Sequence, residues 1–157
     1  MGDNKLNLVI LFGGISSERE VSIKSALEIL SFLNKNYRVK LLEINKNNIS
    51  SFVHQVPKNA LVFNALHGGE GENGQIQSHL DRYKILYTGS GPIASMLAMN
   101  KHFTKVVASE NDIKTPEWLT LRWNSSNAQC NLTVNQNTKI KLPVVVKPNF
   151  QGSTLGL

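Results

Sequence analysis

The chain has 157 residues, of which 41% are apolar and 18% charged, with 17 basic residues against 11 acidic ones. This length suits about one domain with a real core, and the composition argues against disorder and against a coiled coil. The longest apolar run, residues 8–12, is far shorter than the roughly 18 residues that span a bilayer. The single cysteine, Cys130, excludes an internal disulfide.

The basic residues are scattered, without Lys/Arg runs or interleaved aromatic residues, so we expect no nucleic-acid groove. The net charge of +6 suits a protein that handles phosphate or carboxylate groups, although a solvated basic surface explains it equally well. The N-terminal residues do not form a secretory leader. We therefore expect a cytoplasmic protein without a membrane segment.

The first part of the chain alternates apolar strands with helices. Residues 6–12 predict a buried strand, residues 39–44 a second strand and residues 60–66 a third, apolar strand. Residues 85–87 predict a short fourth strand. Ser17 and Glu20 have the spacing of a capping box and begin a helix that runs to about residue 34. A second, short helix follows the third strand. This order predicts an α/β fold with a mostly parallel sheet.

Two glycine-rich loops, residues 13–17 and 67–74, follow the first and third predicted strands. Open parallel sheets bind ligands at the carboxyl ends of their strands. These two loops are therefore the first candidates for a functional site.

The second part of the chain is less regular. Pro92 begins a helix to about residue 100, and residues 101–110 continue as a helix. Residues 118–122 predict a strand, residues 124–138 a polar, Asn-rich loop, and residues 142–146 a β-branched strand that enters a glycine-containing loop.

One dinucleotide-binding pattern is rejected. Residues 89–94 fit G-x-G-x-x-A, with Glu110 about 20 residues later. Glu110 lies in a predicted helix, however, whereas a ribose-binding acid stands at the end of the next strand. The sequence also contains no phosphate-binding P-loop.

The remaining candidates each have two readings. Lys147 followed by Gly152 and Ser153 could cup a phosphate through a lysine charge, successive amides and hydroxyls, or form an ordinary hairpin turn. His67 and Glu72 share a loop that is either a site or a structural turn.

Ordinary helix chemistry also explains two further candidates. Glu18 lies in the first turn of a helix, where any carboxylate is stabilised. Lys101 and its (i, i+4) neighbour Lys105 could simply form a solvated helix face.

Together, these pieces resemble the D-alanine–D-alanine ligases of the ATP-grasp family. The matching segments are residues 13–22, 66–74, 87–91, 99–101, 143–148 and 152–153. They occur in the family's order, and the resemblance covers essentially the whole chain. The resemblance implies that residues 1–100 form a Rossmann-like, pre-ATP-grasp N-terminal domain. Residues 101–157 would be the incomplete beginning of an ATP-grasp domain.

The resemblance also implies an activity, the ATP-dependent joining of two D-alanines into D-alanyl-D-alanine for peptidoglycan, through an acyl phosphate. The metal cofactor would be Mg²⁺ or Mn²⁺, with ligands beyond residue 157. The N-terminal domain would contribute to a homodimer. We expect the chain alone to be inactive, because the metal clamp and most of the nucleotide site lie outside it.

The resemblance assigns roles to individual residues. Glu18 would be a catalytic and substrate-binding residue that holds the ammonium of the first D-alanine, and His67 would line the same pocket. Lys101, Lys147 and Gly152 would bind ATP phosphates. Ser153 would bind ATP and also be a catalytic residue that orients the substrate.

Five residues depart from the family pattern, and one of them is Thr154, which replaces a serine. Asn73 and Asn100 stand where the family usually has aspartate, and Phe150 and Gln151 replace Arg-Glu before the glycine. They change the charge balance of the loops but not the lysines.

Three alternatives remain at this stage. The chain could act as another ATP-grasp carboxylate–amine ligase with a different substrate. It could be a non-catalytic binding or dimerisation module that uses the helical face of residues 22–33. A nicotinamide-binding protein is the third.

Overall fold

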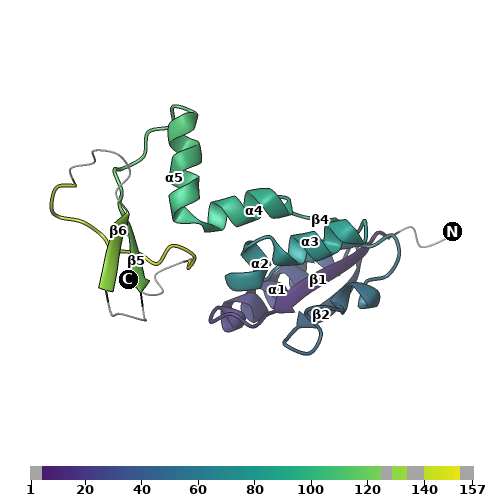
Figure 1. Ribbon diagram of the computed structural model, residues 1–157. Helices are drawn as coiled ribbons and strands as arrows, with labels where there is room; N and C mark the ends of the chain where they lie inside the picture. Colours follow the sequence, from purple (N-terminus) through teal and green to yellow (C-terminus); the bar gives the residue numbers. More distant parts are fainter. Residues whose placement is uncertain (1–4, 125–128, 134–139, 153–157) are drawn as a thin grey trace. The chain divides into compact units, whose positions relative to one another are not determined.

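The computed structural model describes residues 5–124, 129–133 and 140–152 (Figure 1). The chain divides into two compact units, Met1–Met99 and Asn100–Leu157, called unit 1 and unit 2 below.

Unit 1 is built on a parallel sheet. Its strands β1 (Asn7–Gly13), β2 (Arg38–Ile44), β3 (Leu61–Asn64) and β4 (Leu86–Tyr87) lie in the order β2-β1-β3-β4. Each neighbouring pair is parallel, with Leu11 of β1 opposite both Leu42 and Asn64. The predicted α/β fold with a parallel sheet is confirmed.

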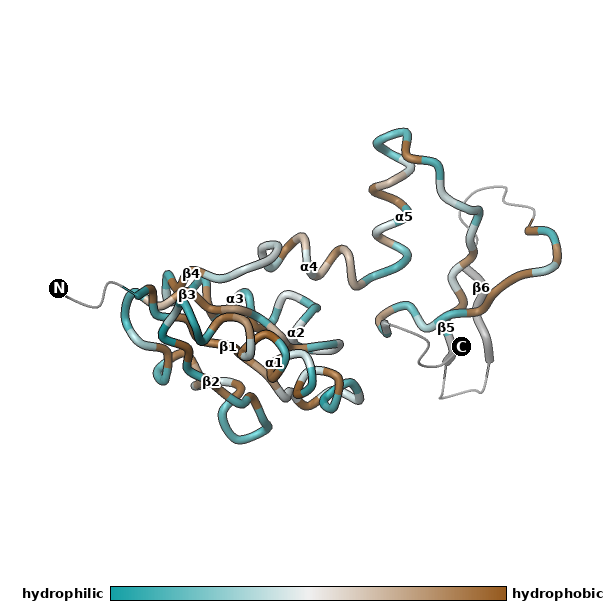
Figure 2. The backbone as a smooth tube through the Cα atoms, turned by 180° about the vertical axis from the view of Figure 1, so that it is seen from behind, coloured by the Kyte–Doolittle hydropathy of each residue, from teal (hydrophilic) through white to brown (hydrophobic). Residues whose placement is uncertain are grey.

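Helices cover both faces of this sheet, because successive side chains of a strand point to opposite sides. Ile10 of β1 packs with Ala26 of helix α1 (Arg19–Leu33) on one face. On the other face, Val9 packs with η1 (Phe52–Gln55) and with α3 (Gln75–Arg82). In unit 1, strand β1 is hydrophobic, whereas the loop that follows β2 is hydrophilic (Figure 2).

The beginning of α1 differs from the prediction. Glu18 is the N-cap residue and makes no side-chain cap hydrogen bond, so the capping box of Ser17 and Glu20 is not formed. Ser16 takes part instead, because its Oγ accepts the N–H of Glu18 at 3.1 Å. The hydroxyl that supports this turn therefore stands one residue before the one we predicted.

After β3, the chain forms the one-turn helix α2 (Gly69–Glu72) and then α3. Helix α4 (Pro92–Met99) follows β4 and closes unit 1. No helix among the described ranges is both long enough and apolar enough to cross a bilayer.

Unit 2 contains helix α5 (Lys101–Glu110) and an antiparallel pair, β5 (Thr120–Asn124) and β6 (Gln129–Thr133). Strand β6 lies within residues 124–138, which we predicted to be a loop. The sequence of this segment has no strand pattern, but its backbone pairs with β5. The strand predicted over residues 142–146 is wrong. Within the described part of the chain this segment has no ladder partner, and β-branched residues form a strand only where another strand accepts their backbone groups.

Candidate functional site

The sheet order creates a natural ligand-binding position between β1 and β3. These strands are neighbours, yet β1 leads into α1 on one face and β3 leads into α2 and α3 toward the other. The following loops therefore leave in opposite directions at the carboxyl ends of the two strands. Open α/β sheets bind ligands at such a switch point. Both glycine-rich loops of unit 1 begin here.

Three side chains hold the two loops together. The buried Ser22 hydroxyl accepts the N–H of Gly13 at 2.9 Å and donates to the carbonyl of Ala65 at 2.7 Å. The hydroxyl of Ser16 donates to the carbonyl of His67 at 2.6 Å. The Glu70 carboxylate accepts the N–H of Ile15. The loop after β1 is therefore fixed to the loop after β3 at three places.

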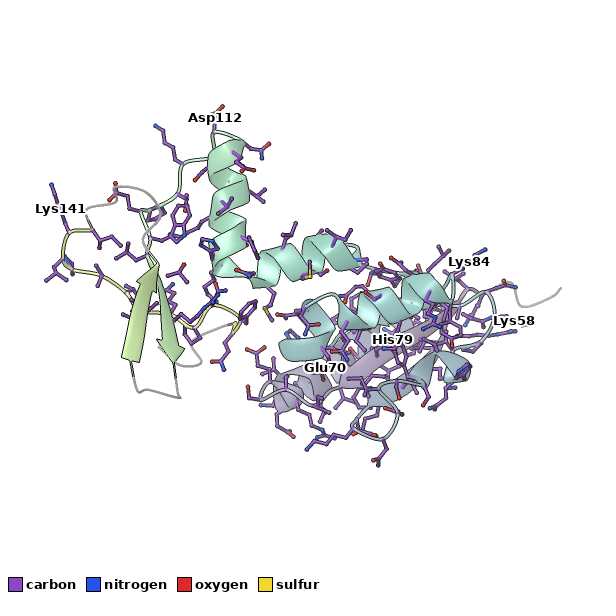
Figure 3. All side chains as sticks on the ribbon, viewed as in Figure 1. Lys58, Glu70, His79, Lys84, Asp112 and Lys141 are labelled. Carbon is purple, nitrogen blue, oxygen red and sulfur yellow. The ribbon has the colours of Figure 1, made fainter. Side chains whose placement is uncertain are left out.

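Glu70 is the least expected of these residues, because a carboxylate is rarely buried. The Glu70 side chain is 6% exposed and lies at α2. Other charged residues of unit 1, such as Lys58 and Lys84, lie at its periphery (Figure 3). The Glu70 side chain also limits the other loop, because a Cβ on Gly14 would be 2.9 Å from Glu70 Oε1.

The two loops bring Glu18 beside the residue that follows His67. Gly68 has φ 64° and ψ 179°, a conformation that is essentially restricted to glycine. A Cβ at this position would lie 2.7 Å from Oε2 of Glu18. The Glu18 carboxylate therefore rests on the backbone of Gly68, and a side chain there would displace it.

The imidazole of His67 lies between two polar side chains. Its Nε2 is 3.0 Å from the hydroxyl of Ser25 on α1, and its Nδ1 is 4.0 Å from Oε1 of Glu72. The first distance is a hydrogen bond and the second is too long for one. The ring is thus oriented by Ser25, while its Nδ1 side can still meet a ligand. A carboxylate and an imidazole so placed can bind a small zwitterion.

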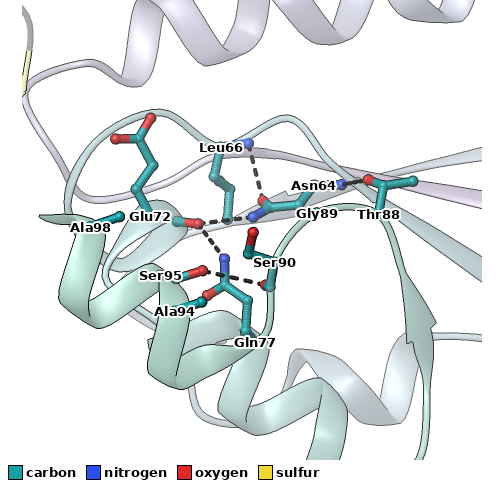
Figure 4. Close-up of a pocket in the computed structure, with 11 residues that line it drawn as sticks. Asn64, Leu66, Glu72, Gln77, Thr88, Gly89, Ser90, Ala94, Ser95 and Ala98 are labelled. Atoms are coloured by element: carbon teal, nitrogen blue, oxygen red, sulfur yellow. Dashed lines mark hydrogen bonds between the residues drawn. The ribbon is translucent and has the colours of Figure 1, made fainter. Parts of the chain in front are cut away.

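A cavity of about 380 Å³ lies next to this junction, between the ends of β3 and β4 and helix α4 (Figure 4). It is lined by Asn64, Leu66, Gly71, Glu72, Gln77, Thr88, Gly89, Ser90, Ala94, Ser95 and Ala98. Glu72 is thus a lining residue whose carboxylate lies 4.0 Å from His67 Nδ1, while Glu18 and His67 themselves are not lining residues. The sequence did not predict this cavity.

One peptide group in the cavity wall is held twice. The carbonyl of Gly71 accepts the amide N–H groups of both Asn64 and Gln77 at 2.8 Å. Gln77 is 6% exposed, and its Oε1 has no hydrogen-bond partner among the described residues.

Unit 2 places two of the predicted phosphate-binding residues around one loop. The N–H of Lys101, the first residue of α5, donates to the carbonyl of Asn149 at 3.1 Å, and its ammonium donates to the carbonyl of Gln151. Lys147 is exposed, and Gly152 is half-buried. Ser153 lies outside the described residues.

Lys105 belongs to the same positively charged region of unit 2. Its ammonium donates to the carbonyl of Pro116 at 2.8 Å and lies 5.2 Å from the ring centre of Trp118. Burial lowers the pKa of Lys105, and the positive charge of Lys147 lowers it further. The two ammonium groups therefore repel each other, and an anion between them would relieve this repulsion.

Three residues of these sites were missed by sequence reasoning, namely Ser25, Glu70 and Asn149. Each acts through a contact with a residue that is distant in the sequence. Only Glu70 carried a signal, since it is an acidic residue inside a glycine-rich loop at a strand end.

Comparisons with known proteins agree with the resemblance. No family model matches the chain. The D-alanine–D-alanine ligase of Pelagibacter ubique (strain HTCC1062) is 41% identical over 152 residues, which cover 94% of this chain and 48% of that protein. The chain is thus similar to the N-terminal part of these ligases, and it spans about half the length of the curated relatives it matches.

Solved structures show the same similarity. The D-alanine–D-alanine ligase of Helicobacter pylori matches with a TM-score of 0.72 and 29% identity, over 97% of this chain and 55% of that chain. The Bacillus anthracis ligase, solved in complex with ATP, matches with a TM-score of 0.70 over 85% of this chain and 50% of that chain. At 22% identity, this second match supports the fold alone.

Proposed function

We propose that this chain supplies the first D-alanine site and part of the ATP site of a D-alanine–D-alanine ligase, whose product serves peptidoglycan synthesis. The proposal depends on one observation: the Glu18 carboxylate lies against Gly68, beside His67, where the loops after β1 and β3 meet. The 41% identity with a D-alanine–D-alanine ligase supports it.

In this proposal, Glu18 pairs with the ammonium of the first D-alanine. Glu18 directly precedes the first residue of α1, at the helix end where a negatively charged side chain is placed favourably. The Nδ1 side of His67 would meet the substrate, and Ser25 would keep the ring oriented. The Ser16 and Glu70 contacts between the loops would keep the pocket in shape before substrate arrives, which lowers the cost of ordering it.

The reaction needs positioning and charge neutralisation. A carboxylate oxygen of the first D-alanine attacks the γ-phosphorus of ATP, and the bond from that phosphorus to the oxygen of ADP breaks. The amine of the second D-alanine then attacks the carbonyl carbon of the acyl phosphate. A C–N bond forms, the C–O bond to phosphate breaks, and the amine releases a proton.

Lys101 and Lys147 would neutralise the phosphate oxygens in the first step, together with Gly152 and Ser153 of the loop. In the structure, the Lys101 ammonium is bonded to Gln151, so ATP would have to compete with this carbonyl. The described residues contain no group of three or more His, Cys, Asp or Glu side chains that could hold a metal ion.

Titration of the chain with D-alanine, followed by NMR or calorimetry, tests the proposal. Glu18→Gln should weaken binding about tenfold or more, because a hydrogen bond to a charged group is lost. Glu28→Gln, which removes a carboxylate from an exposed position of the same helix, should leave binding unchanged. Binding that is absent, or that does not distinguish the two variants, would contradict the proposal. Equal binding of other amino acids would favour a different carboxylate–amine ligase.

A dimerisation role has separate support from α1. Val21, Leu27 and Phe32 are 50%, 55% and 77% exposed, and apolar side chains exposed on this scale are candidates for a protein interface. Light scattering tests the predicted homodimer. A dimer that Phe32→Ser converts to a monomer would support it, and a monomer at all concentrations would exclude it.

A further inference from the structure

The first turn of α5 is capped by two asparagines, Asn100 and Asn149. A helix begins with N–H groups that have no partner within the helix. Here the N–H of Lys101 donates to the backbone carbonyl of Asn149, that of His102 donates to Asn149 Oδ1 at 2.9 Å, and that of Phe103 donates to Asn100 Oδ1 at 3.1 Å. Two residues that are 49 positions apart in the sequence therefore complete one helix end.

The two side chains also bind each other, since Asn149 Nδ2 donates to Asn100 Oδ1 at 2.9 Å. Asn100 is 7% exposed and Asn149 is half-buried, so the bond between them is partly shielded from water. Asn149 presents an acceptor to His102 and a donor to Asn100, a combination that its side-chain amide supplies and an ionised carboxylate does not. The Oδ1 of Asn100 acts only as an acceptor in these contacts, a role that a carboxylate can also fill.

This pair determines where the loop of residues 147–152 lies on α5. Asn149 is two residues after Lys147, and its carbonyl and side chain hold the N–H groups of Lys101 and His102. Two residues further on, the carbonyl of Gln151 receives the ammonium of Lys101. The loop is thus attached to the helix at Asn149 and at Gln151.

We propose that Asn149 is a positioning residue that sets Lys147 and Gly152 in register with Lys101, so that the polyphosphate of a nucleotide meets them as one set. The role in nucleotide binding rests on the proposed function, but the geometry of the asparagine pair does not. The N–H groups that begin α5 are already bonded, so phosphate contacts in this region would come from the lysines and the loop.

Two variants of the full chain with the same charge change test this inference. Asn149→Asp removes the donor and places a carboxylate against Asn100 Oδ1, whereas Asn100→Asp keeps an acceptor for both of its donors. Both add one negative charge at nearly the same place, so the charge effect on ATP cancels in the comparison. The readouts are the hydrogen-exchange protection of the Lys101 and His102 amides, measured by NMR, and the dissociation constant for ATP.

We expect Asn149→Asp to reduce the protection of these amides at least tenfold and to weaken ATP binding at least threefold more than Asn100→Asp does. Lowering the pH until the introduced carboxylate of Asn149→Asp is protonated should restore protection, because a carboxylic acid offers both a donor and an acceptor. A purely destabilised variant would not recover in acid. Equal effects of the two variants, or no loss of protection in Asn149→Asp, would overturn the inference. If the unsubstituted chain binds no ATP, the proposed function and the positioning role fail, while the exchange data still decide whether the asparagine pair fixes the loop.

Discussion

The hydroxyl of Ser25 lies 3.0 Å from Nε2 of His67 and connects helix α1 to the loop after β3. We predict that Ser25→Ala weakens D-alanine binding about threefold to tenfold, which corresponds to the loss of one ordinary hydrogen bond. Ser31→Ala is the matched control, because the Ser31 hydroxyl bonds only locally, to the carbonyl of Glu28 on the exposed side of α1. Calorimetric titrations of both variants decide the matter, and equal affinities would show that Ser25 does not position the ring.

Alanine substitutions at Gly68 and Gly89 distinguish the effect of backbone strain on stability from the effect on the D-alanine site. Both glycines have positive φ values, 64° and 105°, but a Cβ would meet Glu18 at Gly68 and nothing within 4 Å at Gly89. Alanine at either position should lower the free energy of unfolding by about 1–3 kcal/mol. Only Gly68→Ala should also reduce D-alanine affinity, because it displaces the Glu18 carboxylate. Denaturant unfolding and ligand titration measure the two effects, and an unchanged affinity in Gly68→Ala would argue against Glu18 as the ammonium partner.

Tyr87 should make stability depend on alkaline pH. Burial raises the pKa of Tyr87, and a hydrogen bond to Asp81 together with the negative charge of Asp81 raises it further. Since the unfolded chain releases this proton near pH 10, Tyr87 adds no pH dependence to the free energy of unfolding below that pH. The free energy of unfolding falls as the pH rises from about 10 toward the higher folded value.

Ultraviolet titration of the tyrosines and denaturant unfolding between pH 8 and 11.5 measure this effect. Tyr87→Phe should flatten the alkaline loss of stability, and Asp81→Asn should reduce the pKa of Tyr87. An Asp81→Asn variant with an unchanged tyrosine titration would exclude the contribution of Asp81.

The pKa of Lys105 is sensitive to nearby charges in unit 2. Its pKa is lowered by burial and by Lys147, so the unfolded chain holds this proton more tightly. Stability should therefore rise with pH from the folded pKa up to about 10.4. Lys147→Met should raise the pKa of Lys105, and so should tripolyphosphate if it binds between the two ammonium groups.

NMR titration of the lysine side-chain signals measures both shifts. Lys141→Met, which removes an exposed lysine of the same unit, is the control. A polyphosphate that leaves the pKa of Lys105 unchanged would indicate that it does not bind near this pair.

Gln77 tests how much a buried oxygen without a hydrogen-bond partner costs the stability of the fold. Gln77→Met removes one bond to the Gly71 carbonyl, but it also removes the unpartnered Oε1, so stability should change by no more than about 1 kcal/mol. Asn64→Leu should cost about 2–3 kcal/mol, because it also leaves the N–H of Leu66 without its acceptor. Thermal and denaturant unfolding measure the stability of both variants. A larger loss of stability in Gln77→Met than in Asn64→Leu would show that the unpartnered Oε1 of Gln77 does not destabilise the fold.

The sequence predicted the elements whose pattern is local. The apolar run of β1 and the helical spacing of α1 were sufficient, because burial on both faces of a parallel sheet selects such a run. Strand β6 was missed, since what makes residues 129–133 a strand is the backbone of β5. The strand predicted at residues 142–146 is absent because, within the described residues, no other strand pairs with this segment.

For the candidate sites, the sequence indicated which loops matter but not how they are held. Glu18, His67 and Lys147 could be chosen because their types and positions carry chemistry. Ser25, Glu70 and Asn149 act through partners 42, 55 and 47 residues away, respectively. No spacing rule for a single element reaches so far. Their contribution could be recognised only once the two ends of each contact were placed in space.

The capped beginning of α5 has a consequence for how a nucleotide would respond to its surroundings. Backbone amides at a helix end keep a fixed partial charge close to a ligand, but here these amides already hold Asn100 and Asn149. The attraction would then come from ammonium groups such as that of the exposed Lys147. At about 0.15 M salt such charges are screened beyond roughly 8 Å. ATP affinity of unit 2 should therefore decrease as ionic strength rises.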